Sequence, residues 1–356
     1  MAQTTLIVVD SSVEFCASFA KMLEAGGRVR VVGYAGDAYE AREKIKQLDQ
    51  DVVVVSTELP RMNGIPFLRN IMRLRPMPVI MMVPSDECTQ DIMTALEIGA
   101  VDFIVKSGIA SLAEQGEHAD IVCNKVVAAA FAAEHIRRFG PAPMGIYANL
   151  MHLTAESATE KRYSQNIIAI GSSTGGTEAL AEIFAQVPAT LPGIVVAQHI
   201  PPVFSKQFAE RVNQASALRV VEATDGEPIL DGHAYIAPGD YHLRVERRGG
   251  RYFCALAQDA AVNRHRPSVD VLFESVAAQV RGKMVGIILT GMGADGARGL
   301  RTMLEKGAHT IAQDEETSLV WGMPGQAVKP TYSPSPIVIP LSRKALRFGI
   351  ALRNGA

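Results

Sequence analysis

Short apolar runs alternate with amphipathic segments along the first 139 residues of the chain. Five runs rich in β-branched residues predict strands, at Leu6–Val9, Val29–Tyr34, Val52–Val55, Val79–Val83 and Phe103–Val105. Segments with helical spacing accompany them, at Glu14–Ala25, Ala38–Leu48, Gly64–Leu74, Asp91–Ile98 and Ile121–Arg138. Continuous apolar runs suit strands that are buried on both faces, and alternation of strands with helices favours a parallel sheet. The pattern therefore predicts a doubly wound α/β domain over residues 1–139.

A second alternating pattern occupies residues 166–356 and starts with the apolar run Asn166–Ile170. Before it, residues 140–165 open with a Gly-Pro-Ala-Pro sequence and show little periodicity, which predicts a linker. Residues 233–258 interrupt the second pattern, and their alternation around Gly249-Gly250 predicts antiparallel strands joined by a tight turn. We therefore expect two doubly wound, mostly parallel α/β domains, the second with an antiparallel hairpin.

The composition excludes several classes of protein. With 356 residues, 48% of them hydrophobic and 20% charged, the chain is long and apolar enough for two packed cores. Its net charge of −2, with Lys and Arg dispersed, argues against a surface for nucleic acid or anionic membrane. No apolar run approaches the roughly 18 residues of a membrane span, and the four cysteines form no CxxC pair. We expect a cytoplasmic protein without membrane insertion.

A Gly/Ser-rich turn follows the first strand of the second domain. The turn, GSSTGG over residues 171–176, matches the pattern G-x-S-x-G around Ser173 and precedes a helix-like segment. Such a strand-to-helix turn lifts a serine hydroxyl clear of its backbone, and the helix N-terminus offers N–H groups to negative charge. The alternative is a turn that merely connects the strand to the helix.

His199 and Asp295 also follow apolar, strand-like runs, at Ile194–Gln198 and Val285–Thr290. Open α/β sheets place their sites at the carboxyl ends of parallel strands. Taken singly, a histidine at such a place is commonly a surface or capping residue, and Asp295 could simply cap the helix that follows it. The two residues gain significance only in combination with Ser173.

Together the three residues provide the groups of nucleophilic catalysis. A serine hydroxyl becomes a good nucleophile when an imidazole takes its proton, and the imidazole needs a carboxylate to fix its tautomer. We therefore predict that Ser173, His199 and Asp295 form a triad that cleaves carboxylic esters. Their order along the chain differs from the Ser…Asp…His order of α/β-hydrolases.

Two other kinds of site fit the sequence less well. A dinucleotide site would need G-x-G-x-x-G, which GSSTGG lacks, and an acid at the end of the next strand, where Gln198 and His199 stand. Metal catalysis would need clustered histidines, and the eight in this chain are isolated, without an HExxH pair. We expect no cofactor and no metal ion.

Six stretches of the second domain closely resemble the catalytic domain of CheB, the chemotaxis protein-glutamate methylesterase. They are, in order, IIAIGSSTGGTEAL, AQHIPPVFSKQFAERVN, GHAYIAPGDYHL, VNRHRPSVDVLFESVA, GIILTGMGADGARGL and AQDEETSLVWGMP. The resemblance implies Ser173 as nucleophile, His199 as base and Asp295 as orienting acid. It also implies Thr174 as a helper hydroxyl and the Met292 N–H as an oxyanion donor. The implied reactions are hydrolysis of glutamyl γ-methyl esters and, in many members, deamidation of glutamines, both through an acyl-enzyme.

Residues 4–125 resemble a response-regulator receiver domain, a family that accepts phosphate on an aspartate beside two further acids that hold Mg²⁺. Here Ser56 stands at the acceptor position and Ser11 replaces the second acid, whereas Asp10 and Lys106 are retained. Magnesium prefers carboxylate oxygens, and a serine hydroxyl cannot form an acyl phosphate. We predict a degenerate receiver that is not phosphorylated; the alternative is an altered site that uses Glu58.

The two resemblances imply the partners of the protein. Methyl-accepting chemotaxis receptors would be the substrate, and a histidine kinase or another chemosensory protein would dock on the receiver domain. Arg264 and Arg266 could line the substrate cleft or lie solvated on the surface. The alternative function is a non-catalytic docking scaffold, and retention of nucleophile, base and acid together argues against it.

Overall fold

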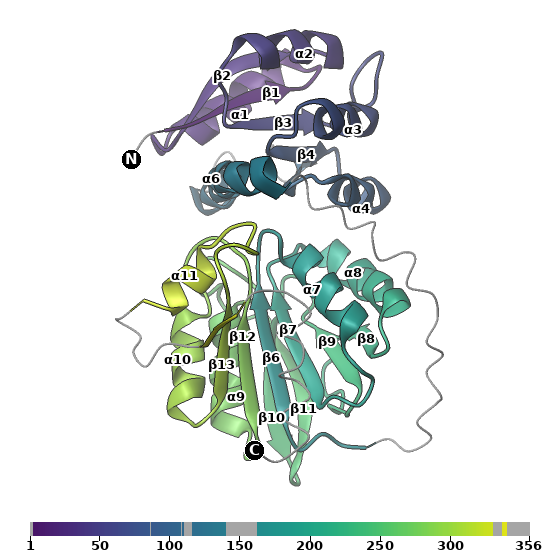
Figure 1. The fold of residues 1–356 in the computed structure, drawn as a ribbon, viewed down its shortest axis with the longest axis vertical. Coiled ribbons are helices and arrows are strands. Elements are labelled where there is room, and N and C mark those ends of the chain that lie inside the picture. Colours follow the sequence, from purple (N-terminus) through teal and green to yellow (C-terminus); the bar gives the residue numbers. More distant parts are fainter. Residues whose placement is uncertain are drawn as a thin grey trace. The chain divides into compact units, whose positions relative to one another are not determined.

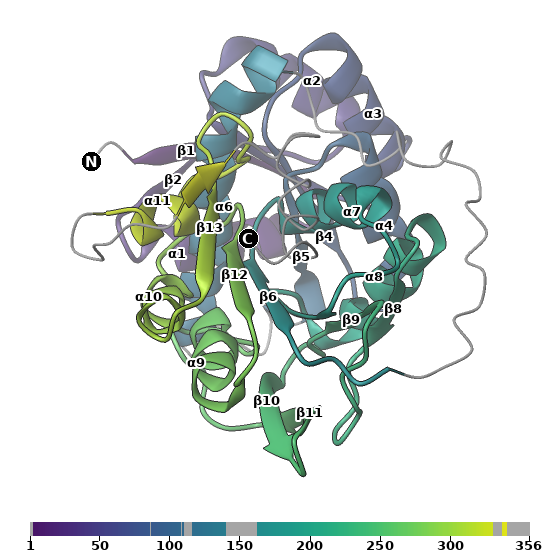
Figure 2. The same cartoon turned by 60° about the horizontal axis from the view of Figure 1, so that its bottom comes forward.

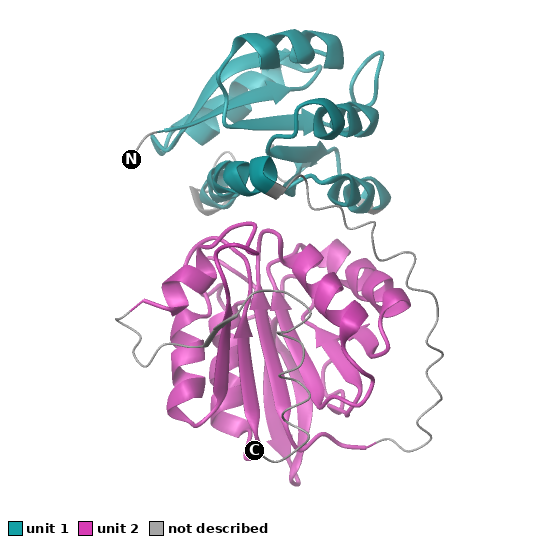
Figure 3. Ribbon diagram, in the orientation of Figure 1, with its two compact units in different colours: residues 1–146 teal, residues 147–356 magenta. Residues whose placement is uncertain are grey.

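The computed structural model describes residues 3–85, 87–107, 109, 116–139, 162–329 and 337–339. Contacts divide the chain into two compact units, residues 1–146 and 147–356 (Figure 3). Most of the predicted linker lies outside the described residues. Among the helices of the described part, none combines the length and the apolar character that crossing a membrane requires.

A five-stranded parallel sheet forms the centre of unit 1, in the spatial order β2-β1-β3-β4-β5 (Figure 1). The strands are β1 (Thr4–Val9), β2 (Val29–Ala35), β3 (Val52–Ser56), β4 (Val79–Val83) and β5 (Asp102–Val105). The helices are α1 (Val13–Glu24), α2 (Ala38–Gln47), α3 (Gly64–Leu74), α4 (Thr89–Ile98) and α6 (Gly116–Phe139).

Local chemistry fixes these elements. The apolar residues of β3 and β4 are fully buried, as expected for central strands of a parallel sheet. The side chains of Ser12, Asp37 and Asn63 accept backbone N–H groups in the first turns of α1, α2 and α3. The predicted doubly wound domain is confirmed, with element ends that differ by a few residues.

A seven-stranded parallel sheet forms the centre of unit 2, in the order β14-β13-β12-β6-β7-β9-β8. The strands are β6 (Ile167–Ser172), β7 (Gly193–Gln198), β8 (Arg219–Glu222), β9 (His233–Ile236), β12 (Met284–Ile288), β13 (His309–Gln313) and β14 (Ile337–Ile339). The helices are α7 (Gly176–Gln186), α8 (Pro202–Ala215), α9 (Val269–Gln279), α10 (Ala297–Glu305) and α11 (Met323–Ala327). Figure 1 shows β6 between β12 and β7, and Figure 2 shows β12 beside β6 from a second direction.

The antiparallel hairpin of unit 2 is shorter than the sequence predicts. Strands β10 (His242–Arg248) and β11 (Arg251–Ala257) form it around Gly249-Gly250, whereas β9 pairs in parallel with β7 and β8. The prediction that antiparallel strands begin at residue 233 is therefore wrong. The physical reason is that Ala234, Tyr235 and Ile236 are all fully buried, which is typical of a strand inside a parallel sheet.

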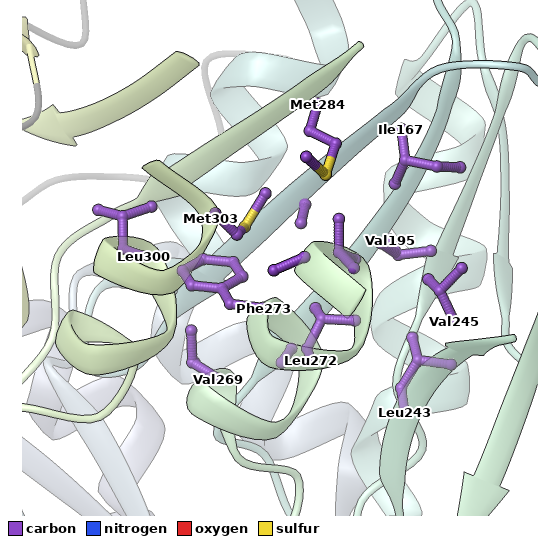
Figure 4. Packing of buried hydrophobic residues seen from close by; sticks show 14 of the residues in the cluster. Ile167, Val195, Leu243, Val245, Val269, Leu272, Phe273, Met284, Leu300 and Met303 are labelled. Carbon is purple, nitrogen blue, oxygen red and sulfur yellow. The ribbon is translucent and has the colours of Figure 1, made fainter. Parts of the chain in front are cut away.

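The core of unit 2 lies between the sheet, helix α9 and the hairpin. Phe273 and Leu272 of α9 are fully buried, together with Val195 of β7 and Leu243 of β10 (Figure 4). Burial of one such side chain contributes about 1.5–3 kcal/mol. This packing fixes the start of α9 against the carboxyl ends of the strands, where the candidate site lies.

Candidate active site

Ser173 directly follows β6, in the turn that leads into α7. Gly175 has φ +78°, a conformation that favours glycine. A Cβ added to Gly176 would lie 2.2 Å from the Gln198 side-chain oxygen, so this position also requires glycine. The sequence GSSTGG therefore folds into the tight strand-to-helix turn that it predicts.

The backbones of Ser173 and His199 lie side by side at the carboxyl edge of the sheet. Ser172 pairs in register with Gln198, and the His199 N–H donates to the Ser172 carbonyl at 3.1 Å. The Gln198 amide donates to the carbonyls of Ser173 (2.9 Å) and His199 (3.1 Å), and its oxygen accepts the Ser172 hydroxyl (2.6 Å). In the sequence, Gln198 marks only the absence of an acid at this strand end. In the structure its side chain connects the turns after β6 and β7.

His199 and Asp295 form a hydrogen bond of 2.8 Å between Nε2 and Oδ2. The two side chains are 7% and 2% exposed, so the pair is shielded from water. Burial on its own would raise the pKa of Asp295. The hydrogen bond and charge of His199, with the donors of Asn263 and Val269, nevertheless hold the pKa of this carboxyl well below its usual range. Asp295 is thus ionised beside the imidazole.

The other nitrogen of His199, Nδ1, is buried and has no hydrogen-bond partner within the described residues. The structure shows no hydrogen bond between Nδ1 and the Ser173 hydroxyl, so the serine and imidazole are adjacent but not engaged. His265 stacks on the imidazole, with ring centroids 3.6 Å apart and planes 10° apart. This stacking leaves the imidazole little room to tilt, and it was not foreseen from the sequence.

Thr174 follows Ser173 in its turn, and Met292 lies in the turn after β12. Thr174 is buried, and its carbonyl accepts the Thr290 hydroxyl at 3.0 Å. Met292 follows Gly291, where an added Cβ would come within 2.6 Å of the Ser173 Cβ. The turn after β12 therefore packs directly against the serine, and only glycine at position 291 allows this approach.

Three further residues bind the Oδ1 atom of Asp295 and were missed as site residues. The Ser268 hydroxyl (2.8 Å) and the Asn263 amide (2.7 Å) donate to Oδ1, and the Asp270 N–H also donates to Oδ1 at 3.2 Å. All three belong to the VNRHRPSVD stretch, whose dense polar residues beside a buried helix were the available signal. Of the two arginines in this stretch, Arg266 forms an ion pair of 2.5 Å with Asp240 and binds two backbone carbonyls, so its guanidinium serves the protein's own loops.

The receiver residues lie at the carboxyl edge of the sheet of unit 1. Asp10 directly follows β1, and its side chain is 2% exposed. It forms an ion pair with Lys106, which directly follows β5. Ser56, the last residue of β3, is fully buried, and its hydroxyl accepts the Glu58 N–H at 3.2 Å. Ser11 is exposed. Among the described residues, the edge therefore presents the buried Asp10 carboxylate, the ammonium of Lys106 and the buried Ser56 hydroxyl.

Cys16 adds no charge to this edge. Burial, and after it the neighbouring Asp10 carboxylate, raises the pKa of the Cys16 thiol to about 11. The thiol is therefore protonated at neutral pH. Within the described residues of the whole chain, no group of three or more His, Cys, Asp or Glu side chains is arranged to hold a metal ion.

Comparison with known proteins supports both resemblances. Residues 168–343 match the CheB methylesterase family and residues 6–114 match the response regulator receiver domain family. The protein-glutamate methylesterase/protein-glutamine glutaminase of Hydrogenovibrio crunogenus is 42% identical over 92% of this chain and 94% of its own length. Such a protein of Xanthomonas euvesicatoria pv. vesicatoria is 46% identical over 96% of both chains.

A solved structure agrees with the fold of unit 2. The crystal structure of the Thermotoga maritima CheB methylesterase catalytic domain superimposes with a TM-score of 0.51 and 40% sequence identity, covering 53% of this chain and 99% of that domain. The high identity over nearly the full length of two-domain relatives extends the similarity to both units. The chain therefore belongs to the protein-glutamate methylesterase/protein-glutamine glutaminase family, with an N-terminal response regulator receiver domain and a C-terminal CheB methylesterase domain.

Proposed function

We propose that the protein removes methyl groups from glutamyl γ-methyl esters of methyl-accepting chemotaxis receptors, in the cytoplasm, with Ser173, His199 and Asp295 as its triad. The observation that carries this proposal is the buried 2.8 Å bond between His199 and Asp295, at the end of the strand adjacent to the Ser173 turn. It leaves one imidazole nitrogen, Nδ1, available to the serine.

The reaction proceeds in two halves. Rotation of the Ser173 side chain brings its hydroxyl to His199 Nδ1, which accepts the proton as the Oγ atom attacks the ester carbonyl. Collapse of the tetrahedral intermediate breaks the ester C–O bond, and Nδ1 returns the proton to the methoxide, so methanol leaves. Water then repeats the sequence on the acyl-enzyme and releases the glutamate. A glutamine side chain follows the same steps with ammonia as the leaving group.

Asp295 fixes the tautomer of the imidazole. Because Nε2 donates to Oδ2, the neutral ring carries its hydrogen on Nε2 and its lone pair on Nδ1. When Nδ1 takes the serine proton, the ionised carboxylate stabilises the imidazolium. We assign Nδ1 as the basic nitrogen on this ground, with Asp295 as an acid that does not itself become protonated.

The negative charge of the tetrahedral intermediate needs donors on the opposite side. We propose the Met292 N–H for this role, with the Thr174 hydroxyl as a helper. The close approach of Gly291 to Ser173 supports this assignment, since Met292 is the next residue. One such donor contributes about 3–4 kcal/mol to lowering the barrier.

The direct test is methanol release from membranes that carry methylated chemotaxis receptors. We expect release by the wild-type chain and none above background by the Ser173→Ala variant. Equal release by the two would exclude the triad assignment. Release by neither, with both proteins folded, would favour the docking scaffold. Ammonia release from unmodified receptors tests deamidation in the same preparation.

We also propose that the receiver domain is not phosphorylated on an aspartate. The family implies Mg²⁺ held by clustered carboxylates, and the described residues of this edge do not fit that ion: serines stand at positions 11 and 56, and the Asp10 carboxylate is already paired with Lys106. Glu58, the alternative acid, is exposed, and its hydrogen bonds with the Ser56 hydroxyl are made by its backbone N–H and carbonyl.

Control of the esterase by a histidine kinase or another chemosensory protein would then act through docking alone. Incubation of the full chain with acetyl phosphate and Mg²⁺ tests this. We expect no covalent phosphate by intact mass and an unchanged rate of methanol release. Stoichiometric labelling at residue 56 or 58 would refute the proposal.

A further inference from the structure

Helices α9 and α10 begin side by side, and each is capped by an aspartate of the other. Asp295, just before α10, accepts the backbone N–H groups of Val269 (2.7 Å) and Asp270 (3.2 Å), the first residues of α9. Asp270 in turn accepts the N–H groups of Gly296 (3.1 Å) and Gly299 (2.7 Å) at the start of α10. The triad acid is therefore one half of a reciprocal pair of caps.

The Asn263 side chain bridges the two carboxylates. Its Nδ2 donates to Asp270 Oδ2 at 2.9 Å and to Asp295 Oδ1 at 2.7 Å. Asn263 has φ +53°, a left-handed conformation that asparagine tolerates better than most residues. A single amide thus uses both of its hydrogens to fix the separation of the two acids.

Two buried carboxylates in contact with one amide repel each other unless donors compensate them. Both side chains are 4% exposed or less. Burial raises the pKa of Asp270, and the charge of Asp295 raises it further. The hydrogen bond from the Gly299 N–H lowers this pKa and opposes part of the effect. The partial positive charges of the two helix N-termini offset this repulsion, and so does the guanidinium charge of Arg298, 3.6 Å from Asp270. Such a fully bonded cluster is rigid because each member has its partners.

The segment that carries Asp295 has little rigidity of its own. Gly293 and Gly296 flank it with φ +92° and +90°, and an added Cβ at Gly293 would meet no atom within 4 Å. Within the described residues, the Asp295 carboxylate is oriented toward His199 by the crossed caps, by the Asn263 bridge and by the Ser268 hydroxyl, which donates to Oδ1 at 2.8 Å. We infer that Asp270 and Asn263 are positioning residues for the reaction, holding the Asp295 carboxylate in line with the imidazole through the two helix starts.

This inference rests on the proposed triad, and its test measures methanol release from methylated receptor membranes by full-length Asp270→Ala. Misplacement of a catalytic group by about 1 Å costs about 100-fold in rate, so we expect kcat to fall about 10- to 100-fold while KM stays unchanged. Asp270→Asn keeps one oxygen for the α10 cap and turns an amide toward Asn263, so kcat should fall less. Asn263→Gly, which tolerates the left-handed backbone, should lower kcat with KM unchanged.

A double-mutant cycle separates positioning from a structural role. In the Asp295→Asn background, Asp270→Asn should cause no further loss of kcat, because residues that act through one group are not additive. An equal fractional loss in both backgrounds would overturn the inference. Wild-type kcat in both Asp270→Asn and Asn263→Gly would also overturn the inference. These two variants test it even if Asp270→Ala does not fold.

Glu274→Gln is the matched control. Glu274 lies on α9 and pairs with Arg298 at 2.8 Å, yet it is 42% exposed and takes no part in the caps. We expect wild-type kcat from this variant. Full activity in Ser173→Ala would refute the proposed triad itself, whereas an inactive Ser173→Ala beside an unimpaired Asp270→Asn would refute only the positioning role.

Discussion

The Nε2 atom of His199 and the Oδ2 atom of Asp295 lie 2.8 Å apart, although 96 residues separate the two in the sequence. The bond is possible because β7 and β12 flank β6 in one parallel sheet, so that the turns after all three strands meet at one edge. The same bond directs Nε2 to the acid and leaves Nδ1 as the nitrogen that we propose as the base. The first predictions concern this pair.

Asp295→Asn should lower methanol release by about 10³- to 10⁴-fold, the loss that follows when a triad imidazole adopts the wrong tautomer. The asparagine amide can donate its NH₂ group to Nε2. The ring hydrogen would then lie on Nδ1, which could no longer accept the serine proton. Rates measured at saturating receptor concentration check this. A variant within tenfold of wild type would show that Asp295 does not orient His199.

The stability of unit 2 should depend on pH through Asp295. Its folded-state pKa lies below the value of about 3.9 expected in the unfolded chain. The ionised carboxylate therefore stabilises the native state at pH above about 3.9, and this stabilisation is lost as pH falls through the folded-state pKa, because the unfolded chain binds more protons.

Trp321, the single tryptophan of the chain, reports on the unfolding of unit 2. Urea unfolding followed by its fluorescence should give wild type a higher free energy of unfolding than Asp295→Asn at pH 7. The difference between the two free energies should narrow below about pH 4. A difference that stays constant from pH 7 to strongly acidic solution would contradict the depressed pKa.

The sequence predicted both sheets and the three triad candidates for the same physical reason. Strands buried on both faces leave unbroken apolar runs such as Val52–Val55, and polar residues directly after such runs stand at the edge where sites form. Ser173 and His199 directly follow such runs, and Asp295 lies in the turn after a third one. Strand β9 was misassigned because its short run adjoins the alternating residues of β10, and local pattern alone does not mark the boundary.

Asn263 and Asp270 carry no such signal. Their contacts arise from the tertiary placement of α9 against α10, in which the first turn of one helix meets the acid of the other. The identity of the nitrogen that faces Asp295 is likewise a matter of side-chain orientation. These features depend on packing between segments far apart in sequence, which periodicity does not encode.

Gly291→Ala should impair catalysis without unfolding the protein. The added methyl group would lie 2.6 Å from the Ser173 Cβ and 2.4 Å from the Met323 sulfur. The methionine can shift, but the serine must move with its turn, and a displacement of about 1 Å costs about 100-fold in rate. Gly26→Ala, where an added Cβ meets nothing within 4 Å, is the control and should retain full methanol release. Equal activity of the two variants would show that the Gly291 contact does not position Ser173.

If the receiver domain is not phosphorylated as we propose, it should accept phosphate once carboxylates are supplied at positions 11 and 56. Ser56 is fully buried at the end of β3 and Lys106 is already paired with Asp10, so Ser56→Asp adds a second buried carboxylate for which the described residues hold no further cation. In the Ser11→Asp/Ser56→Asp variant three carboxylates meet at one edge, which suits Mg²⁺ and destabilises the domain without it. We therefore expect Mg²⁺ to raise the Tm of this variant and not that of wild type.

Acetyl phosphate with Mg²⁺ should add one phosphate by intact mass to this variant, and none to Ser11→Asp/Ser56→Asn, which lacks the acceptor carboxylate. If the double aspartate variant folds yet neither binds Mg²⁺ nor gains phosphate, then residues 11 and 56 do not account for the proposed inability of this edge to accept phosphate.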